Sequence, residues 1–221
     1  MKPVNYRNFK LSLLNTKEYR HIYLLLFWPL FGIIFYSQEL LIPMNFHTVY
    51  SPLDDLIPFC ELFMIPYLFW FIFLVWVMVY GFFFDVPTFK KYMYFLMITY
   101  TITILIYFIY PTKQELRPQE FARDNFLVDI VRAYHGFDTN TNVCPSLHCM
   151  GSFTSAFAAI HSKRYSNLGW RIFFLGTAFL ISASTVFVKQ HSIIDVIWAL
   201  VICFIVYPFV FLIKPSKRKA Q

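Results

Sequence analysis

Six apolar stretches separated by polar connections dominate the pattern of the chain. A helix that crosses a membrane needs about 20 predominantly apolar residues, and most of the stretches reach that length. We therefore predict helices over residues 22–42, 57–84, 92–110, 147–162, 170–188 and 192–213. The fourth is short and contains Ser152, Thr154 and Ser155, so we expect it to pack against other helices.

The composition also favours a membrane protein. Hydrophobic residues make up 58% of the chain and charged residues only 14%, whereas a soluble domain carries about a quarter charged residues. The predicted fold is all-α: an integral membrane six-helix bundle that forms one domain over residues 1–221. The bilayer is the expected partner. Nucleic acid is not, because no basic segment interleaves with exposed aromatic residues.

Positive charge is distributed unevenly between the two ends of the predicted helices. If segment 1–21 lies in the cytoplasm and the helices alternate in direction, five of the 19 Lys and Arg residues fall outside: Lys113, Arg117, Arg123, Arg132 and Lys189. The cytoplasmic excess includes a basic cluster after the last helix, formed by Lys214, Lys217, Arg218 and Lys219. Cytoplasmic loops are enriched in Lys and Arg, so this pattern predicts a multi-pass cell-membrane protein with both termini cytoplasmic.

The long outer segment 111–146 connects the third and fourth predicted helices. Its apolar residues partly follow helical spacing with charges between them: Phe121, Leu127, Ile130, Val131 and Tyr134. This spacing predicts an amphipathic helix on the membrane surface. A loop helix packed over the bundle would show the same pattern.

Two histidines and an aspartate are the strongest candidates for chemistry. His191 and Asp195 are four residues apart, so on a helix they share one face within hydrogen-bonding reach. A carboxylate that holds one ring nitrogen leaves the other free as a base or nucleophile. The fourth and fifth predicted helices form a hairpin, which returns His148 to the membrane face that carries this pair. Such groups beside a bilayer are costly, so their convergence indicates a catalytic site.

Phosphoryl transfer suits the residues around these histidines. A phosphate ester needs positive charge and N–H donors around its oxygens, and an acid for the departing alcohol. Arg117 offers a planar fork for two phosphate oxygens. Ser146 stands at an expected helix N-cap, so the amides of Leu147 and His148 would form an anion site.

These residues occur in motifs that resemble the type 2 phosphatidic acid phosphatase superfamily. That family combines a Lys-x6-Arg-Pro, a Pro-Ser-Gly-His and a Ser-Arg-x5-His-x3-Asp motif. Three parts of this chain carry the resemblance: Arg117-Pro118, Pro145-Ser146-Leu147-His148, and the set Ser184, His191 and Asp195. The order of the motifs and the six-helix core are also similar. The run Asp54-Asp55-Leu56-Ile57-Pro58-Phe59 resembles a bacterial branch of the family.

Two positions depart from the family pattern. Tyr110 stands where the first-motif lysine belongs, and Thr185 stands where the third-motif arginine belongs. Lys113 or Lys189 would supply the missing charge at the phosphate site, although Lys189 also suits an interfacial residue that reaches toward headgroups. Ser184 is a candidate through the resemblance, and a helix-packing serine is its alternative.

The resemblance implies a metal-independent lipid phosphatase that forms a phosphohistidine and needs no cofactor. Its expected catalytic residues are His148, His191 and Asp195. Its expected phosphate-binding residues are Arg117, Ser146, Leu147, Lys189, Lys113 and Ser184. The cysteines around His148, Cys144 and Cys149, fit no standard zinc spacing, so no metal is expected.

Two other functions stay open. The departures leave room for a lipid phosphotransferase similar to the sphingolipid synthases, which keep two histidines and an aspartate. A small transporter or channel is the alternative from another class of protein. It would place polar residues along a route through the bundle, whereas this sequence gathers them at one face. The substrate would be a lipid phosphate or polyprenyl diphosphate, and neither the particular lipid nor the oligomeric state is defined by the sequence.

Overall fold

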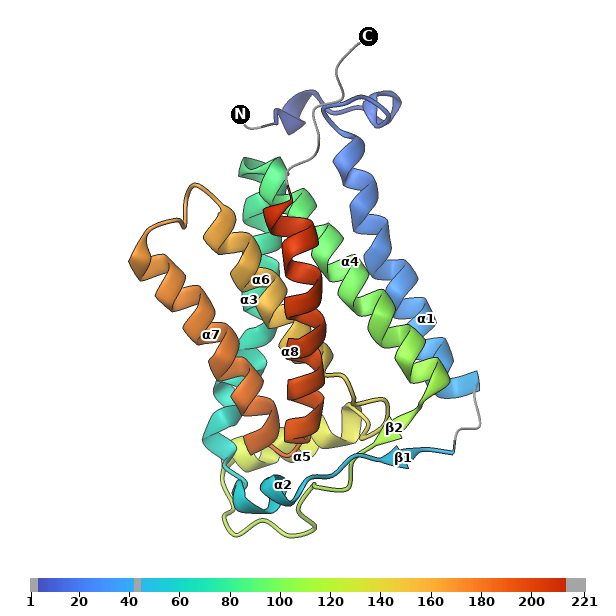
Figure 1. Cartoon of the computed structure of the whole chain (residues 1–221), viewed down its shortest axis with the longest axis vertical. Coiled ribbons are helices and arrows are strands. Elements are labelled where there is room, and N and C mark those ends of the chain that lie inside the picture. The colour runs from blue at the N-terminus through green and yellow to red at the C-terminus, as the bar shows by residue number, and fades with distance from the viewer. Residues whose placement is uncertain (1–3, 42–44, 214–221) are drawn as a thin grey trace.

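The computed structural model shows a bundle of long helices with short elements gathered at one end (Figure 1). The structure describes residues 4–41 and 45–213. Within these residues the α-helices are α1 (Phe27–Leu41), α2 (Pro52–Leu56), α3 (Met64–Phe84), α4 (Val86–Ile109), α5 (Phe126–Phe137), α6 (Leu147–His161), α7 (Leu168–Phe187) and α8 (Ile193–Tyr207). The predicted all-α class is therefore confirmed.

Short helical and extended elements complete the described chain. The 3₁₀ helix η3 (Arg20–Leu26) leads into α1, and the π-helix η5 (Pro208–Leu212) follows α8. Strand β1 (His47–Thr48) pairs in parallel with β2 (Thr112–Lys113). The remaining 3₁₀ helices are η1 (Tyr6–Asn8), η2 (Leu11–Leu13) and η4 (Glu61–Phe63).

Five segments of the described chain are long and apolar enough to cross a membrane, which is consistent with a multi-pass membrane protein. They are Arg20–Gln38, Glu61–Phe84, Val86–Ile109, Leu168–Phe187 and Ile193–Leu212. The fourth predicted helix corresponds to α6, which has only 15 residues. The predicted count of six membrane-spanning helices is therefore not confirmed.

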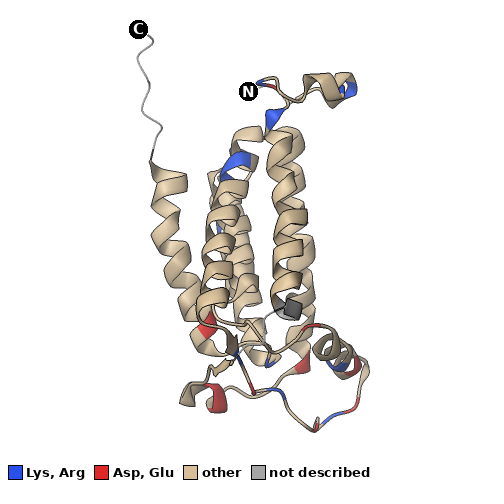
Figure 2. Cartoon of the chain, turned by 90° about the vertical axis from the view of Figure 1, so that its right-hand side faces the viewer, with Lys and Arg blue, Asp and Glu red and all other residues tan. Residues whose placement is uncertain are grey.

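Charged residues lie near the two ends of the bundle and are sparse along its middle (Figure 2). This distribution suits helices whose central turns contact hydrocarbon. The predicted basic cluster of Lys214, Lys217, Arg218 and Lys219 lies outside the described residues. Which end faces the cytoplasm stays a prediction.

Capping and backbone conformation account for the largest differences between predicted and observed helix ends. α3 begins at Met64, later than predicted, because Ile57 and Cys60 have extended backbone and η4 precedes it. α4 begins earlier than predicted. The side chain of Asp85 accepts a hydrogen bond from the backbone N–H of Thr88 at 3.3 Å and so caps this helix.

Helix α6 lies at the centre of the bundle. All of its residues from His148 through Ala159 are buried, and it packs against α3, α4, α7 and α8. Its many Gly, Ala and Ser residues allow neighbouring helix backbones to approach closely. The predicted packing of this segment against other helices is confirmed.

Helix α5 occupies the long segment between α4 and α6. It packs against α3, with Val128 and Val131 buried on its inner face. A helix is therefore present within the predicted segment 111–146. Its position on a membrane surface stays a prediction.

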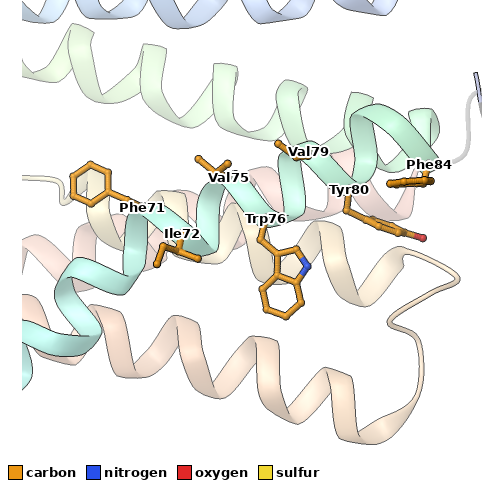
Figure 3. A pocket seen from close by; sticks show the side chains of 7 residues that line it. All are labelled: Phe71, Ile72, Val75, Trp76, Val79, Tyr80 and Phe84. Atoms are coloured by element: carbon orange, nitrogen blue, oxygen red, sulfur yellow. The ribbon is translucent and has the colours of Figure 1, made fainter. Parts of the chain in front are cut away.

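A shallow groove of about 630 Å³ runs along α3, and Figure 3 shows the seven side chains that line it. Its lining is aromatic and aliphatic: Phe71, Ile72, Val75, Trp76, Val79, Tyr80 and Phe84. Such a surface suits contact with lipid. None of these residues is a predicted site residue.

Gly151 of α6 lies where two aromatic side chains converge. A Cβ atom at this position would lie 2.7 Å from Tyr100 Oη and 3.0 Å from Trp70 Nε1. We predict that Gly151→Ala lowers the Tm of the detergent-solubilised protein by several degrees, because overpacking a core costs about 1–3 kcal/mol. The matched control is Gly176→Ala, where nothing lies within 4 Å of the added Cβ. Equal Tm values for the two variants would contradict this packing.

Candidate active site

Asp195 and His191 meet at the first turn of α8. Nδ1 of His191 and Oδ2 of Asp195 are 3.0 Å apart, and both side chains are buried. The same Oδ2 accepts a hydrogen bond from the backbone N–H of Ser192 at 3.0 Å, which completes a capping box with this N-cap residue. The carboxylate thereby engages Nδ1 of His191, and Nε2 is left as the ring atom for a ligand.

His148 approaches this pair from the N-terminal turn of α6. The ring centroids of His148 and His191 are 5.7 Å apart. The rings of Tyr67 and Trp70 flank His148 at centroid distances of 4.7 and 4.4 Å. Nε2 of His148 is buried and has no hydrogen-bond partner among the described residues. A buried nitrogen without a partner is costly, and a bound ligand would relieve that cost.

The backbone ties the two histidine-bearing loops together. The N–H of Ser146 donates to the carbonyl oxygen of Asp195 at 3.1 Å. The hydroxyl of Ser146 in turn accepts from the N–H of Cys149 at 3.3 Å and caps α6, as predicted from the sequence. Tyr107 of α4 adds a bond from its hydroxyl to the carbonyl oxygen of Pro145 at 2.6 Å. The relative position of the two histidines is therefore set by main-chain contacts.

A cavity of about 50 Å³ lies between these elements. Its lining residues come from α1, α4, α6 and the loops before α6 and α8: Phe35, Tyr107, Asp138, Thr139, Thr141, Asn142, Val143, Leu147, His148, Gln190 and His191. The structure thus brings the predicted residues Leu147, His148 and His191 to one place.

The polar wall of this cavity was not predicted from the sequence. Gln190 directly precedes His191 in the chain, and that adjacency was the available signal. Asn142 has a φ of 51°, in the left-handed region that asparagine tolerates better than most residues. The loop that contains it lines the same cavity as the histidines, and no periodic pattern in the sequence predicts this.

Arg117 lies behind the cavity wall. Its guanidinium donates to the carbonyl oxygens of His135 at 2.7 Å and Asp138 at 2.6 Å, and to Oε1 of Gln190 at 2.8 Å. Its Nε is buried without a partner among the described residues. The guanidinium therefore reaches the cavity through Gln190, a residue of the lining.

Burial shapes the electrostatics around Arg117. Burial lowers the pKa of Arg117 from its ordinary value, and the nearby Asp138 carboxylate opposes this change. The pKa of His135 falls to about 4, mainly because the ring is buried and also because Arg117 is close. His135 is consequently neutral at physiological pH and adds no positive charge to the site.

Three predicted phosphate-site residues are engaged away from the cavity. Nζ of Lys189 donates to two main-chain carbonyl groups in segment 54–57. Lys113 forms an ion pair with Glu115, and the hydroxyl of Ser184 donates to a carbonyl oxygen within α7. The expectation that Lys113 or Lys189 replaces a missing family cation is therefore not supported by these contacts.

The two positions that depart from the family motifs are also occupied by other interactions. Tyr110 stacks on His47 with ring centroids 4.0 Å apart. The hydroxyl of Thr185 donates to the carbonyl oxygen of Ser182 at 2.8 Å. Neither position offers a positive charge to the cavity.

All four cysteines are free thiols. Cys144 lies beside the site, and its pKa is raised above the ordinary value by burial and then by the charge of Asp195. The thiol therefore stays protonated, which makes it a poor nucleophile and a poor metal ligand. Metal-independent chemistry stays a prediction.

The fold and the candidate site together define a helical membrane protein with two facing histidines at one end of its bundle. The PAP2 superfamily model matches residues 91–219, more than half of the chain, and the chain belongs to that superfamily. Membership supports phosphatase or phosphotransferase activity on lipid-like substrates. No match was found among curated proteins or solved structures. The predicted superfamily is confirmed, while the bacterial-branch resemblance of residues 54–59 lies outside the match and stays a prediction.

Arg117→Lys tests whether the hydrogen bonds of the guanidinium keep segment 111–146 in its place beside the site. Lysine keeps the charge but cannot donate to three acceptors in the same fork geometry. We predict that chymotrypsin cleaves segment 111–146 several-fold faster in this variant than in the wild type. Arg123→Lys is the control, because the Arg123 side chain is 72% exposed and a lysine there retains the ion pair with Glu61. Unchanged cleavage of the Arg117→Lys protein would show that the loop does not depend on this residue.

Proposed function

We propose that this chain is an integral membrane lipid phosphatase that hydrolyses a phosphomonoester or diphosphate lipid. The observation that carries the proposal is that His148 and His191 line one cavity while Asp195 engages Nδ1 of His191. Membership of the PAP2 superfamily supports phosphoester chemistry. The cavity of about 50 Å³ is small, so the phosphate of the substrate would enter it and the rest of the lipid would stay outside.

In the first step, Nε2 of His191 attacks phosphorus. The N–P bond forms as the P–O bond to the lipid alcohol or phosphate breaks. Burial lowers the pKa of the His148 ring, so His148 would take up its proton when the negatively charged phosphate binds beside it, and it then donates that proton to the departing oxygen. Asp195 stabilises the positive charge that develops on the His191 ring. The result is a phosphohistidine and a free lipid product.

In the second step, water replaces the departed lipid. His148, now neutral, takes a proton from water as the water oxygen attacks phosphorus and the N–P bond breaks. Inorganic phosphate leaves, and His191 returns to its starting form. No metal or cofactor is required by this sequence of proton transfers.

Phosphate oxygens would be held by the N-terminus of α6, and Arg117 would act on them from behind the cavity wall. Ser146 caps α6, and the amides of Leu147 and His148 lie in its first turn, where a helix favours anions. Arg117 would contribute positive charge through Gln190. This arrangement has one arginine where the family motifs combine a lysine and two arginines.

An apolar groove next to the site supports a lipid substrate. It measures about 470 Å³ and lies between the site-facing ends of α4 and α8. Ile106, Trp198 and Ile202 form part of its wall, and Cys144 and Pro145 connect it with the loop that carries His148. A hydrocarbon tail in this groove would place its headgroup beside the histidines.

The proposed location is the cell membrane, with both termini in the cytoplasm and the histidines at the extracytoplasmic face. The charge distribution of the sequence supports this orientation. The described N-terminal segment and the end of α8 lie at the opposite end of the bundle from α2, α5 and the two strands (Figure 1). The single domain predicted over residues 1–221 is part of the same proposal.

A lipid phosphotransferase is the second candidate. The absence of a cation at Tyr110 and Thr185 favours it, because these are the positions at which the chain departs from the phosphatase motifs. The chemistry would be the same up to the phosphohistidine, and an acceptor alcohol would then replace water. The two functions differ only in the second product.

Alanine substitution of the histidines tests the proposal. In vesicles that contain phosphatidic acid, phosphatidylglycerol phosphate or a polyprenyl diphosphate, we predict that His191→Ala abolishes turnover. His148→Ala and Asp195→Asn should lower kcat by about 10²- to 10⁴-fold, because a proton donor or the orientation of the nucleophile is lost. Release of inorganic phosphate, with no phosphorylated acceptor lipid formed, would identify hydrolysis rather than transfer.

His161→Ala is the matched control for these variants. His161 lies at the other end of α6, where its ring bonds to the hydroxyl of Tyr207 at 2.8 Å. The activity of the His161→Ala protein should equal that of the wild type within about twofold. Near-normal turnover by the His191→Ala protein would overturn the assignment of the nucleophile.

A further inference from the structure

The short helix α2 carries a buried carboxylate that the proposed mechanism does not use. Asp54 is 0% exposed. Its Oδ2 accepts hydrogen bonds from the backbone N–H of Ser51 at 2.9 Å and from the hydroxyl of Ser192 at 2.6 Å. Its Oδ1 accepts from the backbone N–H of Ile193 at 2.8 Å. A buried carboxylate needs such donors, so this contact between α2 and α8 is specific.

Two of these donors belong to the first turn of α8. The first backbone N–H groups of a helix have no partner inside the helix and need acceptors from elsewhere. Asp54 takes the N–H of Ile193, and Asp195 takes the N–H of Ser192. Because the two carboxylates divide these N–H groups between them, Oδ2 of Asp195 also stays within reach of Nδ1 of His191, at 3.0 Å.

Lys189, in the turn before α8, also bonds to the α2 segment. Its Nζ donates to the carbonyl oxygen of Asp54 at 2.7 Å and also to that of Ile57. Lys189 has a φ of 58°, a left-handed conformation that costs about 1–2 kcal/mol for a residue other than glycine. The contacts with α2 therefore act on the turn that leads directly into His191.

The α2 segment lies outside the part of the chain that matches the PAP2 superfamily, which begins at residue 91. It nevertheless sits at the site end of the bundle, together with α5 and the two strands (Figure 1). The preceding strand β1 pairs with β2 and so fixes the other end of this segment.

We propose that Asp54 is a positioning residue that holds the first turn of α8 and, through it, the Asp195–His191 pair. Asp54 does not line the cavity of the two histidines, so it would act through Ser192 and Ile193 and not on the substrate. The proposal rests on the proposed function of His191.

Asp54→Asn tests this role while keeping the size of the side chain. The amide has one acceptor oxygen where the carboxylate has two and lacks its negative charge, so the backbone N–H of Ile193 or of Ser51 would lose its acceptor and the contact with α8 would weaken. We predict a fall in kcat of about 10- to 100-fold, with KM changed by less than about threefold. Asp55→Asn is the matched control, because Asp55 is the next residue, is exposed and bonds to Tyr50. It should retain wild-type kcat.

A double-mutant cycle with Ser192→Ala shows whether the effect passes through α8. If the two residues act through their shared hydrogen bond, the double variant loses less activity than the product of the two single losses. Multiplicative losses, or an unchanged kcat in Asp54→Asn, would overturn the proposal. If Asp54→Asn does not fold, Ser192→Ala alone should still lower kcat with little change in KM, and an unchanged kcat in this variant would also overturn it.

A spectroscopic measurement separates this proposal from the proposed function. In the full chain labelled with ¹⁵N-histidine in detergent, the His191 signals are assigned by their loss in His191→Ala. Asp54→Asn should shift these ring nitrogen signals, and Asp55→Asn should leave them unchanged. If the wild-type protein turns over no lipid phosphate but Asp54→Asn shifts the His191 signals, the proposed phosphatase function is contradicted and the positioning role of Asp54 is supported. Unshifted His191 signals would overturn the positioning role even in an active enzyme.

Discussion

The candidate site depends on the hydrogen bonds that the buried carboxylate of Asp195 accepts. One oxygen atom accepts hydrogen bonds from His191 and from the N-cap residue Ser192, both at 3.0 Å. The carbonyl oxygen of the same residue accepts the N–H of Ser146 at 3.1 Å, which fastens the start of α6 beside the start of α8. The same carboxylate oxygen therefore both caps α8 and orients the ring of His191. These two donors to Oδ2 offset part of the cost of burying the carboxylate, while its Oδ1 has no partner among the described residues.

The helices could be predicted from the sequence because length and apolar character dominate their formation. Differences at their ends arise from short-range chemistry, such as the cap supplied by Asp85 and the extended backbone before Met64. The central position of α6 was also predictable from its small residues. Its length of 15 residues shows that a helix at the centre of a bundle need not be long enough to span a bilayer alone.

The proposed catalytic residues were predictable for a different reason. The four-residue spacing of His191 and Asp195 is a local property of helices, and the hairpin of two helices brings His148 to the same end. The position of Lys189 was not predictable, because a left-handed backbone and a contact with α2 decide where its ammonium lies. Asp54 was noted in the sequence only as part of the run that resembles a bacterial branch, and its contact with α8 was not predicted. Its capping box is visible in the sequence, but its bonds to α8 connect residues far apart in the chain.

His191 is proposed to form a covalent bond with phosphorus, and trapping that phosphohistidine is the most direct test. The protein would be mixed with a lipid substrate labelled with ³²P at its terminal phosphate, quenched within milliseconds in alkali and digested for mass spectrometry. Alkali is used because phosphohistidine is stable in base and labile in acid. The proposed mechanism predicts label on His191 and none on the His191→Ala protein. Label on any other residue, or full turnover with no covalent label at any quench time, would contradict it.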